Sequence, residues 1–321
     1  MKNNCSIIIP AIKLDKDLEH CILACNELAN VNIKIYIISD KKISKRFKNT
    51  TFKSFGKINM SKKRNLAVKF VKDKYIAFLD ADCYPTKKWI SHAINILKKD
   101  KKIGIVSGPD FPFPNQKGFQ KTLGLAHKSF ILSGSKTFRK NLVRKKKVKQ
   151  VSSCNMVLKK ETFERVNGMD PKIYIGEDVD FCNRVNKLFN IIYSPNVKIF
   201  HKSREFIPFL AQRYSYGTCI FDAFKITKSI KNIQYFGPLI VTLFLFLGVF
   251  SSFTPYSEHI IFINILVLTV ILFESIKLSS NIFEILKLII ILSSGIIFFG
   301  IGSIAKIFGF SKNLKAIYTY R

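Results

Sequence analysis

The chain has 321 residues, with 53 Lys and Arg against 21 Asp and Glu, which gives a formal net charge of +32. The length allows one large domain or two small ones with a sizeable core, and the seven scattered cysteines contain no C-x-x-C pair, which argues against a disulfide framework and a zinc site. The charge would suit a nucleic-acid binder, but it is mostly lysine in a chain equally rich in Ile, Asn and Phe, as AT-rich coding produces.

The composition changes near residue 231. Up to that point apolar runs alternate with charged stretches, whereas from Asn232 onward apolar residues dominate and charges are isolated. We therefore expect a soluble domain over residues 1–230 and a membrane region over residues 231–321. The N-terminal SIIIP is too short for the apolar part of a secretory signal and leads directly to Lys13. We expect the soluble domain to stay in the cytosol.

The soluble domain begins with an alternation of apolar strands and helices. Near-continuous apolar runs suit strands buried on both faces of a parallel sheet, and residues at helical spacing lie between them. The predicted strands are Cys5–Ile12, Ile33–Asp40, Tyr75–Leu79 and Ile103–Gly108, and the predicted helices cover residues 18–28, 65–71 and 89–97. This alternation predicts an α/β sheet with helices on both faces.

Three aspartates, Asp40, Asp80 and Asp82, lie at the ends of predicted strands. Ligands of such sheets bind outside the carboxyl ends of the strands, and in extended chain Asp80 and Asp82 point the same way. Two close carboxylates repel unless a cation lies between them or one is protonated, and Mg²⁺ and Mn²⁺ take oxygen ligands. The pair predicts a metal–diphosphate site; the alternative is a turn with solvated acids.

The D-x-D pattern also occurs at Asp15/Asp17 and Asp178/Asp180, so the pattern alone is weak. The first pair precedes a helical pattern and predicts a helix start. Glu177 and Asp178 open another predicted helix, where its dipole favours anions. The alternatives for these two acids are simple capping and general-base catalysis, which needs a carboxylate within hydrogen-bond reach of a hydroxyl.

Residues 136–149 contain eight basic residues and no acidic one. The segment is interpreted either as a solvated, mobile loop or as a surface for anionic lipid or a phosphate-bearing acceptor.

The last third has three uncharged stretches, residues 232–257, 259–273 and 288–305. The first is long enough for a spanning helix starting near Pro238, the second is marginal and the third suffices, so two or three crossings are expected. The basic tail favours the cytosolic side, which conflicts with three crossings from a cytosolic domain. Glycines in the third stretch, Gly295, Gly300 and Gly302, predict close helix packing.

Seven segments of the chain, over about Ser6–Gly217, resemble in their order the motifs of family 2 glycosyltransferases. These segments are SIIIP, IISD, KKRNLAV, AFLDADCYP, VSSCNMVLKKETFERVNGMD, GEDVDFCNRV and QRYSYG. Each motif is weak alone, whereas the ordered set is specific. The resemblance implies a GT-A fold, that is a Rossmann-like, mostly parallel sheet flanked by helices, here followed by an all-α transmembrane region. It also implies a nucleotide-diphospho-sugar donor, Mn²⁺ or Mg²⁺, and inversion at the anomeric carbon.

The resemblance also implies roles for individual residues. The catalytic base would be Asp178, with Glu177 beside it supporting acceptor binding, and Ser153 and Asn155 would lie on the acceptor side, where SCN departs from the Gly-Ala-Asn of many relatives. The implied donor-binding residues are Pro10, Asp40, Arg64, Asp80, Asp82, Gln212 and Arg213. The implied metal ligands are Asp80, Asp82 and His201, although His201 is equally consistent with a structural histidine.

The resulting hypothesis is a multi-pass membrane enzyme with a cytoplasmic catalytic domain. It would move one sugar to a lipid-linked or glycan acceptor, in cell-surface polysaccharide or glycoconjugate synthesis, without a nucleic-acid partner. A processive polymerase is not expected, because the tryptophan that such relatives carry beside Gln212 and Arg213 is missing; Trp89 is the only one in the chain. The alternatives are a non-catalytic, basic, membrane-tethered binder of nucleic acid or lipid, and a nucleotidyltransferase.

Overall fold

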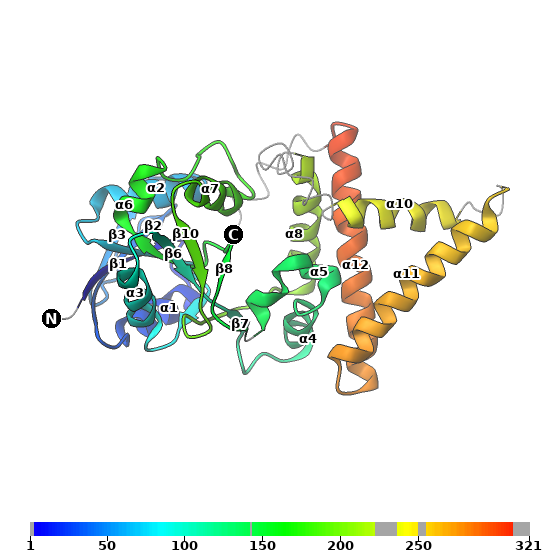
Figure 1. Cartoon of the computed structure of the whole chain (residues 1–321), viewed down its shortest axis with the longest axis horizontal. Coiled ribbons are helices and arrows are strands. Elements are labelled where there is room, and N and C mark those ends of the chain that lie inside the picture. The colour runs from blue at the N-terminus through cyan, green and yellow to red at the C-terminus, as the bar shows by residue number, and fades with distance from the viewer. Residues whose placement is uncertain (1–2, 142, 222–235, 250–254, 311–321) are drawn as a thin grey trace. The chain divides into compact units, whose positions relative to one another are not determined.

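The computed structural model describes residues 3–141, 143–221, 236–249 and 255–310 (Figure 1). Its described residues form two compact units. The α/β unit comprises residues 3–111 and 141–202, and the helical unit comprises residues 112–140 and 203–310.

An eight-stranded sheet forms the α/β unit, with strand order β3-β2-β1-β4-β9-β6-β10-β8. The strands are β1 (Asn3–Pro10), β2 (Val31–Ser39), β3 (Thr50–Ser54), β4 (Tyr75–Leu79), β6 (Ile103–Ser107), β8 (Lys146–Val148), β9 (Asn155–Lys159) and β10 (Asn190–Tyr193). The first four are parallel, β9 is antiparallel to both β4 and β6, and β10 is parallel to β6. The carboxyl ends of β1, β2, β4, β6 and β10 therefore meet the first residue of β9 at one edge, called the carboxyl edge below.

Helices cover both faces of this sheet, as predicted. They are α1 (Lys16–Asn26), α2 (Met60–Phe70), α3 (Trp89–Lys99), α6 (Lys160–Arg165) and α7 (Glu177–Asn186). Ile7 and Ile9 of β1 share one buried cluster with apolar side chains of α1 and α3. On the other face, Phe163 of α6 lies between the rings of Phe78 and Phe181, with ring centroids 5.7 and 5.5 Å away. Successive strand residues point to opposite faces, so both sides of the central strands are apolar.

The Asp15/Asp17 pair starts α1 as predicted. The Asp15 carboxylate accepts a hydrogen bond from the Leu18 backbone N–H at 2.9 Å. This is an N-cap interaction, which satisfies one of the free N–H groups of the first turn. The first of the three D-x-D pairs is therefore a structural feature.

A second, small sheet lies next to the carboxyl edge. Its strands β5 (Cys83–Pro85), β11 (Ile199–His201) and β7 (Asp110–Pro112) have the order β5-β11-β7. In the antiparallel pair β5–β11, His201 lies opposite Cys83. This pairing brings residues that are more than a hundred positions apart in the chain to the end of β4.

The Asn155 side chain joins the segments of the carboxyl edge. Its Oδ1 accepts a hydrogen bond from Trp89 Nε1 at 2.8 Å, and its Nδ2 donates to the carbonyls of Val197, Gly108 and Pro109 at 2.9, 3.0 and 3.2 Å. Asn155 is 1% exposed. One buried amide thus connects α3, the loop after β6 and the loop before β11.

The basic segment 136–149 is not only a loop, as one interpretation had it. It includes part of the 3-10 helix η1 (Gly134–Lys140) and the strand β8, which pairs antiparallel with β10 at the outer edge of the sheet. Lysines on an edge strand hinder pairing with a further strand. This gives the basic residues of β8, Lys146 and Lys147, a structural role.

The helical unit consists of α4 (Gly118–Ala126), α5 (Phe130–Ser133), η1, α8 (Phe206–Thr218), α10 (Gly237–Val249), α11 (Ser257–Leu278) and α12 (Ile282–Ile307). The predicted close packing of the glycines is confirmed. A Cβ at Gly295, Gly300 or Gly302 would overlap Leu132, Thr242 or the Tyr214 backbone. Residues 112–140 and 203–221 belong to this unit, so its boundary differs from the one predicted at residue 230.

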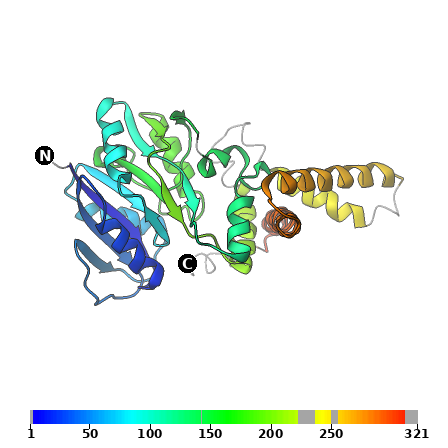
Figure 2. The same ribbon diagram turned by 90° about the horizontal axis from the view of Figure 1, so that it is seen from below.

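Among the residues that the structure describes, two helices are long and apolar enough to cross a membrane, α11 with 22 residues and α12 with 26. In Figure 2 α12 is seen end-on, and α10 and α11 extend away from it. The most apolar part of α12 is 56% buried within the protein, whereas that of α11 is only 11% buried. The predicted span over residues 232–257 is described only in part, and its helix α10 has 13 residues.

We expect Asn155→Ala to destabilise the α/β unit strongly. The substitution leaves the Trp89 N–H and up to three carbonyls without their partner, at about 1–3 kcal/mol for each buried group that is left unsatisfied. The measurement is thermal or denaturant unfolding of the full chain in detergent. Asn32→Ala is the matched control, because its amide bonds Asn4 at an exposed position, and it should cost about 0.5 kcal/mol or less. Equal unfolding midpoints for the two variants would contradict the role given to Asn155.

Candidate active site

Asp40, at the carboxyl end of β2, is paired with a buried lysine. Lys63 Nζ of α2 lies 2.6 Å from Asp40 Oδ1 and also donates to the Ala11 carbonyl. Burial lowers the pKa of Lys63, and the Asp40 carboxylate opposes this effect. The lysine was not singled out from the sequence, although it is part of the KKRNLAV segment.

Arg64 connects two carboxylates that different elements bring to the carboxyl edge. Its two terminal nitrogens lie 3.1 Å from Asp80 Oδ1 and 3.1 Å from Glu177 Oε1, and the residue is 2% exposed. Burial and the neighbouring Asp178 raise the pKa of Glu177, while the Arg64 guanidinium lowers it. The structure therefore brings together three of the predicted site residues, Arg64, Asp80 and Glu177.

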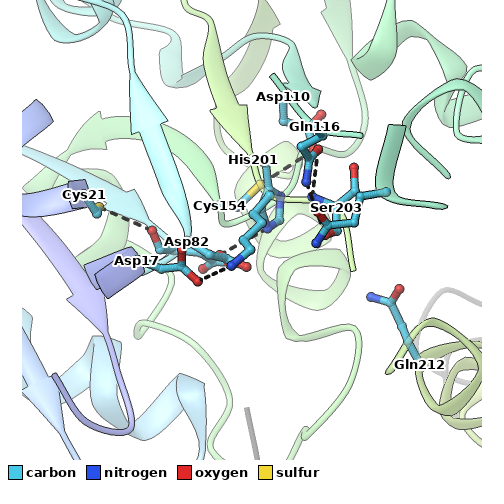
Figure 3. A network of polar contacts seen from close by, with 12 residues as sticks. Asp17, Cys21, Asp82, Asp110, Gln116, Cys154, His201, Ser203 and Gln212 are labelled. Atoms are coloured by element: carbon cyan, nitrogen blue, oxygen red, sulfur yellow. Dashed lines mark hydrogen bonds and ion pairs between the residues drawn. The ribbon is translucent and has the colours of Figure 1, made fainter. Parts of the chain in front are cut away.

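Asp82 and His201 form the second part of the site. Nε2 of His201 lies 3.2 Å from Asp82 Oδ1, because strand β11 runs back along β5. Burial alone would lower the pKa of His201, but the Asp82 carboxylate and hydrogen bonds with Asp82 and Cys154 raise it to about 10. Figure 3 shows the Asp82 and His201 side chains directed at each other.

The Asp82–His201 pair fits a divalent cation. A carboxylate oxygen and an imidazole nitrogen converge, both are ligands of Mn²⁺-type ions, and Asp82 is 38% exposed, which leaves an open side. Asp80, the third predicted ligand, instead directs Oδ1 at Arg64. Of the three predicted metal ligands, the structure thus pairs two.

Asp178 lies in the first turn of α7, which begins after Gly176 with φ of 81°. Glu177 and Asp178 are neighbours there, and three acids lie at the helix N-terminus, where the helix dipole favours negative charge. Asp180 is not part of the site, because it forms an ion pair with Arg184. Catalysis by Asp178 stays a prediction.

The predicted acceptor-side residues are buried. Ser153 and Asn155 precede and begin β9, and both are almost inaccessible. Because the Asn155 amide is engaged by four groups of the protein, the structure does not support its predicted contact with an acceptor. Pro10, the predicted base-site residue, ends β1 and is buried as well.

Gln212 and Arg213 belong to α8 of the helical unit. Arg213 donates to the carbonyls of Gly295 and Leu132 at 3.2 and 3.4 Å, and its guanidinium lies 5.1 Å from the centre of the Phe299 ring. These contacts fix the guanidinium among the helices, so they do not support the predicted phosphate contact. Gln212 donates to the Tyr216 hydroxyl at 2.8 Å, and its role in donor binding stays a prediction.

Further polar residues around Asp82 were missed from the sequence. Lys202 Nζ lies 2.8 Å from Asp17 Oδ2, and Asp110 and Cys154 lie beside His201. The two residues Asp110 and Cys154 are 44 positions apart and follow no motif spacing. The fold brings them together, because Asp110 begins β7 of the small sheet and Cys154 directly precedes β9 of the large sheet.

Comparison with known families gives two matches. The sequence model of glycosyl transferase family 2 matches residues 6–166. The model described as N-terminal domain of galactosyltransferase matches residues 135–201. No curated protein matches the chain significantly.

Solved structures similar to this chain include TarS of Staphylococcus aureus (residues 1–349) and GalNAc-T7. TarS in complex with UDP-GlcNAc has 12% identity and a TM-score of 0.47, over 64% of this chain and 60% of TarS. TarS alone has 11% identity and a TM-score of 0.42, over 61% and 60%. GalNAc-T7 with UDP, GalNAc and Mn²⁺ has 13% identity and a TM-score of 0.49, over 63% of this chain and 43% of GalNAc-T7. The chain thus spans less than two thirds of either protein.

The family 2 match covers half of the chain, and it includes strands β1, β2, β4, β6 and β9 as well as the acids Asp40, Asp80 and Asp82. The alternation of strands and helices around this sheet is the GT-A arrangement expected from the sequence motifs. The chain belongs to glycosyl transferase family 2.

Proposed function

We propose that this chain is an inverting, metal-dependent glycosyltransferase that moves a single sugar from a nucleotide-diphospho-sugar to a lipid-linked or glycan acceptor. The observation that carries the proposal is the Asp82–His201 pair at the carboxyl edge, next to the Arg64-centred cluster of Asp80 and Glu177. Family membership favours glycosyl transfer over the two alternatives, a non-catalytic binder and a nucleotidyltransferase.

The donor is proposed to bind across the carboxyl ends of β1, β2 and β4. Asp40, held by Lys63, would contact the nucleobase near Pro10, and Asp80, oriented by Arg64, would accept a hydrogen bond from the ribose. Because Lys63 pairs with Asp40 and Arg64 pairs with Asp80, a diphosphate can approach these two carboxylates without meeting their full uncompensated charge.

Asp82 and His201 are the residues that would hold Mn²⁺ or Mg²⁺. The bound cation would stabilise the negative charge on the leaving diphosphate as a Lewis acid. His201 is kept in position by strand pairing with β5, and Asp82 by the short turn in which the Cys83 N–H donates to the Asp80 carbonyl at 3.2 Å.

Asp178 would remove the proton from the attacking acceptor hydroxyl. Glu177 is held by Arg64, so its neighbour Asp178 is presented at the first turn of α7 at a fixed place relative to Asp80. A single displacement, with the hydroxyl attacking the face opposite the diphosphate, inverts the anomeric carbon.

The proposed location is the membrane, with the α/β unit in the cytoplasm and a role in cell-surface polysaccharide or glycoconjugate synthesis. The helices α11 and α12 support membrane attachment by their length and composition. The apolar surface of α11 is exposed along most of the helix, as at Phe262, Leu266 and Phe273. Such a surface is rare on a soluble monomer.

Asp82→Ala should abolish cation-dependent donor hydrolysis, because it removes one of two proposed ligands. The assay is release of nucleoside diphosphate from a panel of nucleotide-sugars with Mn²⁺. Asp15→Ala is the matched control, because that acid belongs to another D-x-D pair and only caps α1. It should cost about 1 kcal/mol of stability and leave hydrolysis intact. Near-normal hydrolysis by Asp82→Ala would refute the metal assignment.

Asp178→Asn should keep donor binding but reduce sugar transfer by about 10²-fold or more, because an amide cannot act as the base. The comparison is donor affinity by calorimetry against transfer rate with a lipid-linked acceptor mixture. Asp180→Asn is the control, because Asp180 lies two positions after Asp178 in the same helix and forms an ion pair with Arg184. Undiminished transfer by the Asp178 variant would place the base elsewhere.

Membrane attachment through α11 is expected to resist salt. The full chain should stay in the membrane fraction in 1 M salt, a concentration at which electrostatic interactions are screened over about 3 Å, and should be released only by detergent. Leu266→Arg should weaken membrane insertion, because a charge at the centre of a spanning helix makes the free energy of insertion less favourable by about 2.5–3.5 kcal/mol. Release of the unmodified chain by salt would instead indicate attachment through its lysines.

A further inference from the structure

Asp110, Cys154 and His201 form a cluster of three different ligand types. Each offers one ligand atom, and these atoms lie within 4.8 Å of one another. Asp110 and Cys154 are buried, and the Cys154 thiol is 3.9 Å from Asp110 Oδ2 and within hydrogen-bonding reach of His201. Figure 3 shows the three side chains side by side.

The backbone around this cluster is fixed. Asp110 begins β7, Cys154 directly precedes β9, and His201 ends β11. The Asn155 amide, next to Cys154, donates to the Pro109 carbonyl, next to Asp110, at 3.2 Å. The Ile199 N–H of β11 donates to the same carbonyl at 3.0 Å. Two hydrogen bonds to one carbonyl thus link the three segments, and the ligand atoms are positioned in advance.

The chemistry of the three ligands differs from that of a magnesium site. Magnesium prefers carboxylate, carbonyl and water oxygens, whereas thiolate and imidazole favour zinc. Catalytic zinc sites usually have three protein ligands, drawn from Cys, His and carboxylate side chains, and a fourth position that is open to water.

We propose that Asp110, Cys154 and His201 form a second metal site, which binds a thiophilic divalent cation, Zn²⁺, beside the proposed Asp82 site. His201 belongs to both sets of ligands, and two dications at neighbouring positions repel each other. Zn²⁺ bound here therefore weakens binding of Mn²⁺ near Asp82. This last consequence rests on the proposed function, whereas Zn²⁺ binding itself does not.

A competing set of ligands is Asp82, Cys83 and His201, whose ligand atoms also lie within 4.8 Å of one another. The two sets differ in the thiol, and both Cys83 and Cys154 are buried. Substituting each thiol separately distinguishes the two sets.

The test uses the full chain in detergent, stripped of metal and titrated with Co²⁺ as a spectroscopic substitute for zinc, and then with Zn²⁺ against a chromophoric chelator. The unmodified chain should show a thiolate-to-cobalt charge-transfer band that Zn²⁺ removes. Cys154→Ser should lose the band and bind Zn²⁺ at least about tenfold more weakly, and Asp110→Asn should weaken Zn²⁺ binding with the band retained. Thermal unfolding checks that both variants are folded.

Three further variants make the result decisive. Cys83→Ser should keep the band, and so should Cys182→Ser, whose thiol contacts the Val151 carbonyl away from the site. Asp82→Ala should also keep it, even though it stops donor hydrolysis, so a failure of the proposed function and a failure of the zinc site are distinguishable. The proposal is overturned if the unmodified chain shows no thiolate band, or if the band depends on Cys83 and survives in Cys154→Ser.

Discussion

The site depends on the neutralisation of acidic side chains that the sheet brings to one edge. Asp40 and Asp80 directly follow strands β2 and β4, and α7 adds Glu177 nearby. Their mutual repulsion is relieved by the buried cations Lys63 and Arg64, two consecutive residues of α2. A single helical turn therefore holds the acids in place, and Asp82 is left as the carboxylate directed at His201, toward the position proposed for the cation.

Much of the fold could be predicted because its signals are local. Ile-rich runs such as the one ending at Pro10 form strands buried on both faces, and α1, α3 and α7 begin close to where the helical spacing indicated. Strand β9 was not foreseen, because its direction in the sheet depends on pairing with β4 and β6. Both of these strands are far from β9 in the sequence. The assignment of residues 112–140 to the helical unit was missed for the same reason.

The site was predictable only where its residues belong to motifs. Asp80, Asp82, Arg64 and Glu177 were singled out, but the sequence could not indicate that Arg64 bridges two of them. Asn155 was expected at the acceptor; in the structure its amide instead joins α3 to the loop after β6 and the loop before β11, a role that no motif reveals. Cys154 and Asp110 carry no spacing signal, so their proximity to His201 is visible only in three dimensions.

The most direct test of the central claim is a structure of the full chain with Mn²⁺ and a nucleoside diphosphate, in which the anomalous signal of manganese locates the ion. The account predicts one strong manganese peak in contact with the Asp82 carboxylate and the His201 imidazole, with the diphosphate on its open side. A bound nucleotide without a peak at Asp82, or with the ion held by other residues, would contradict it.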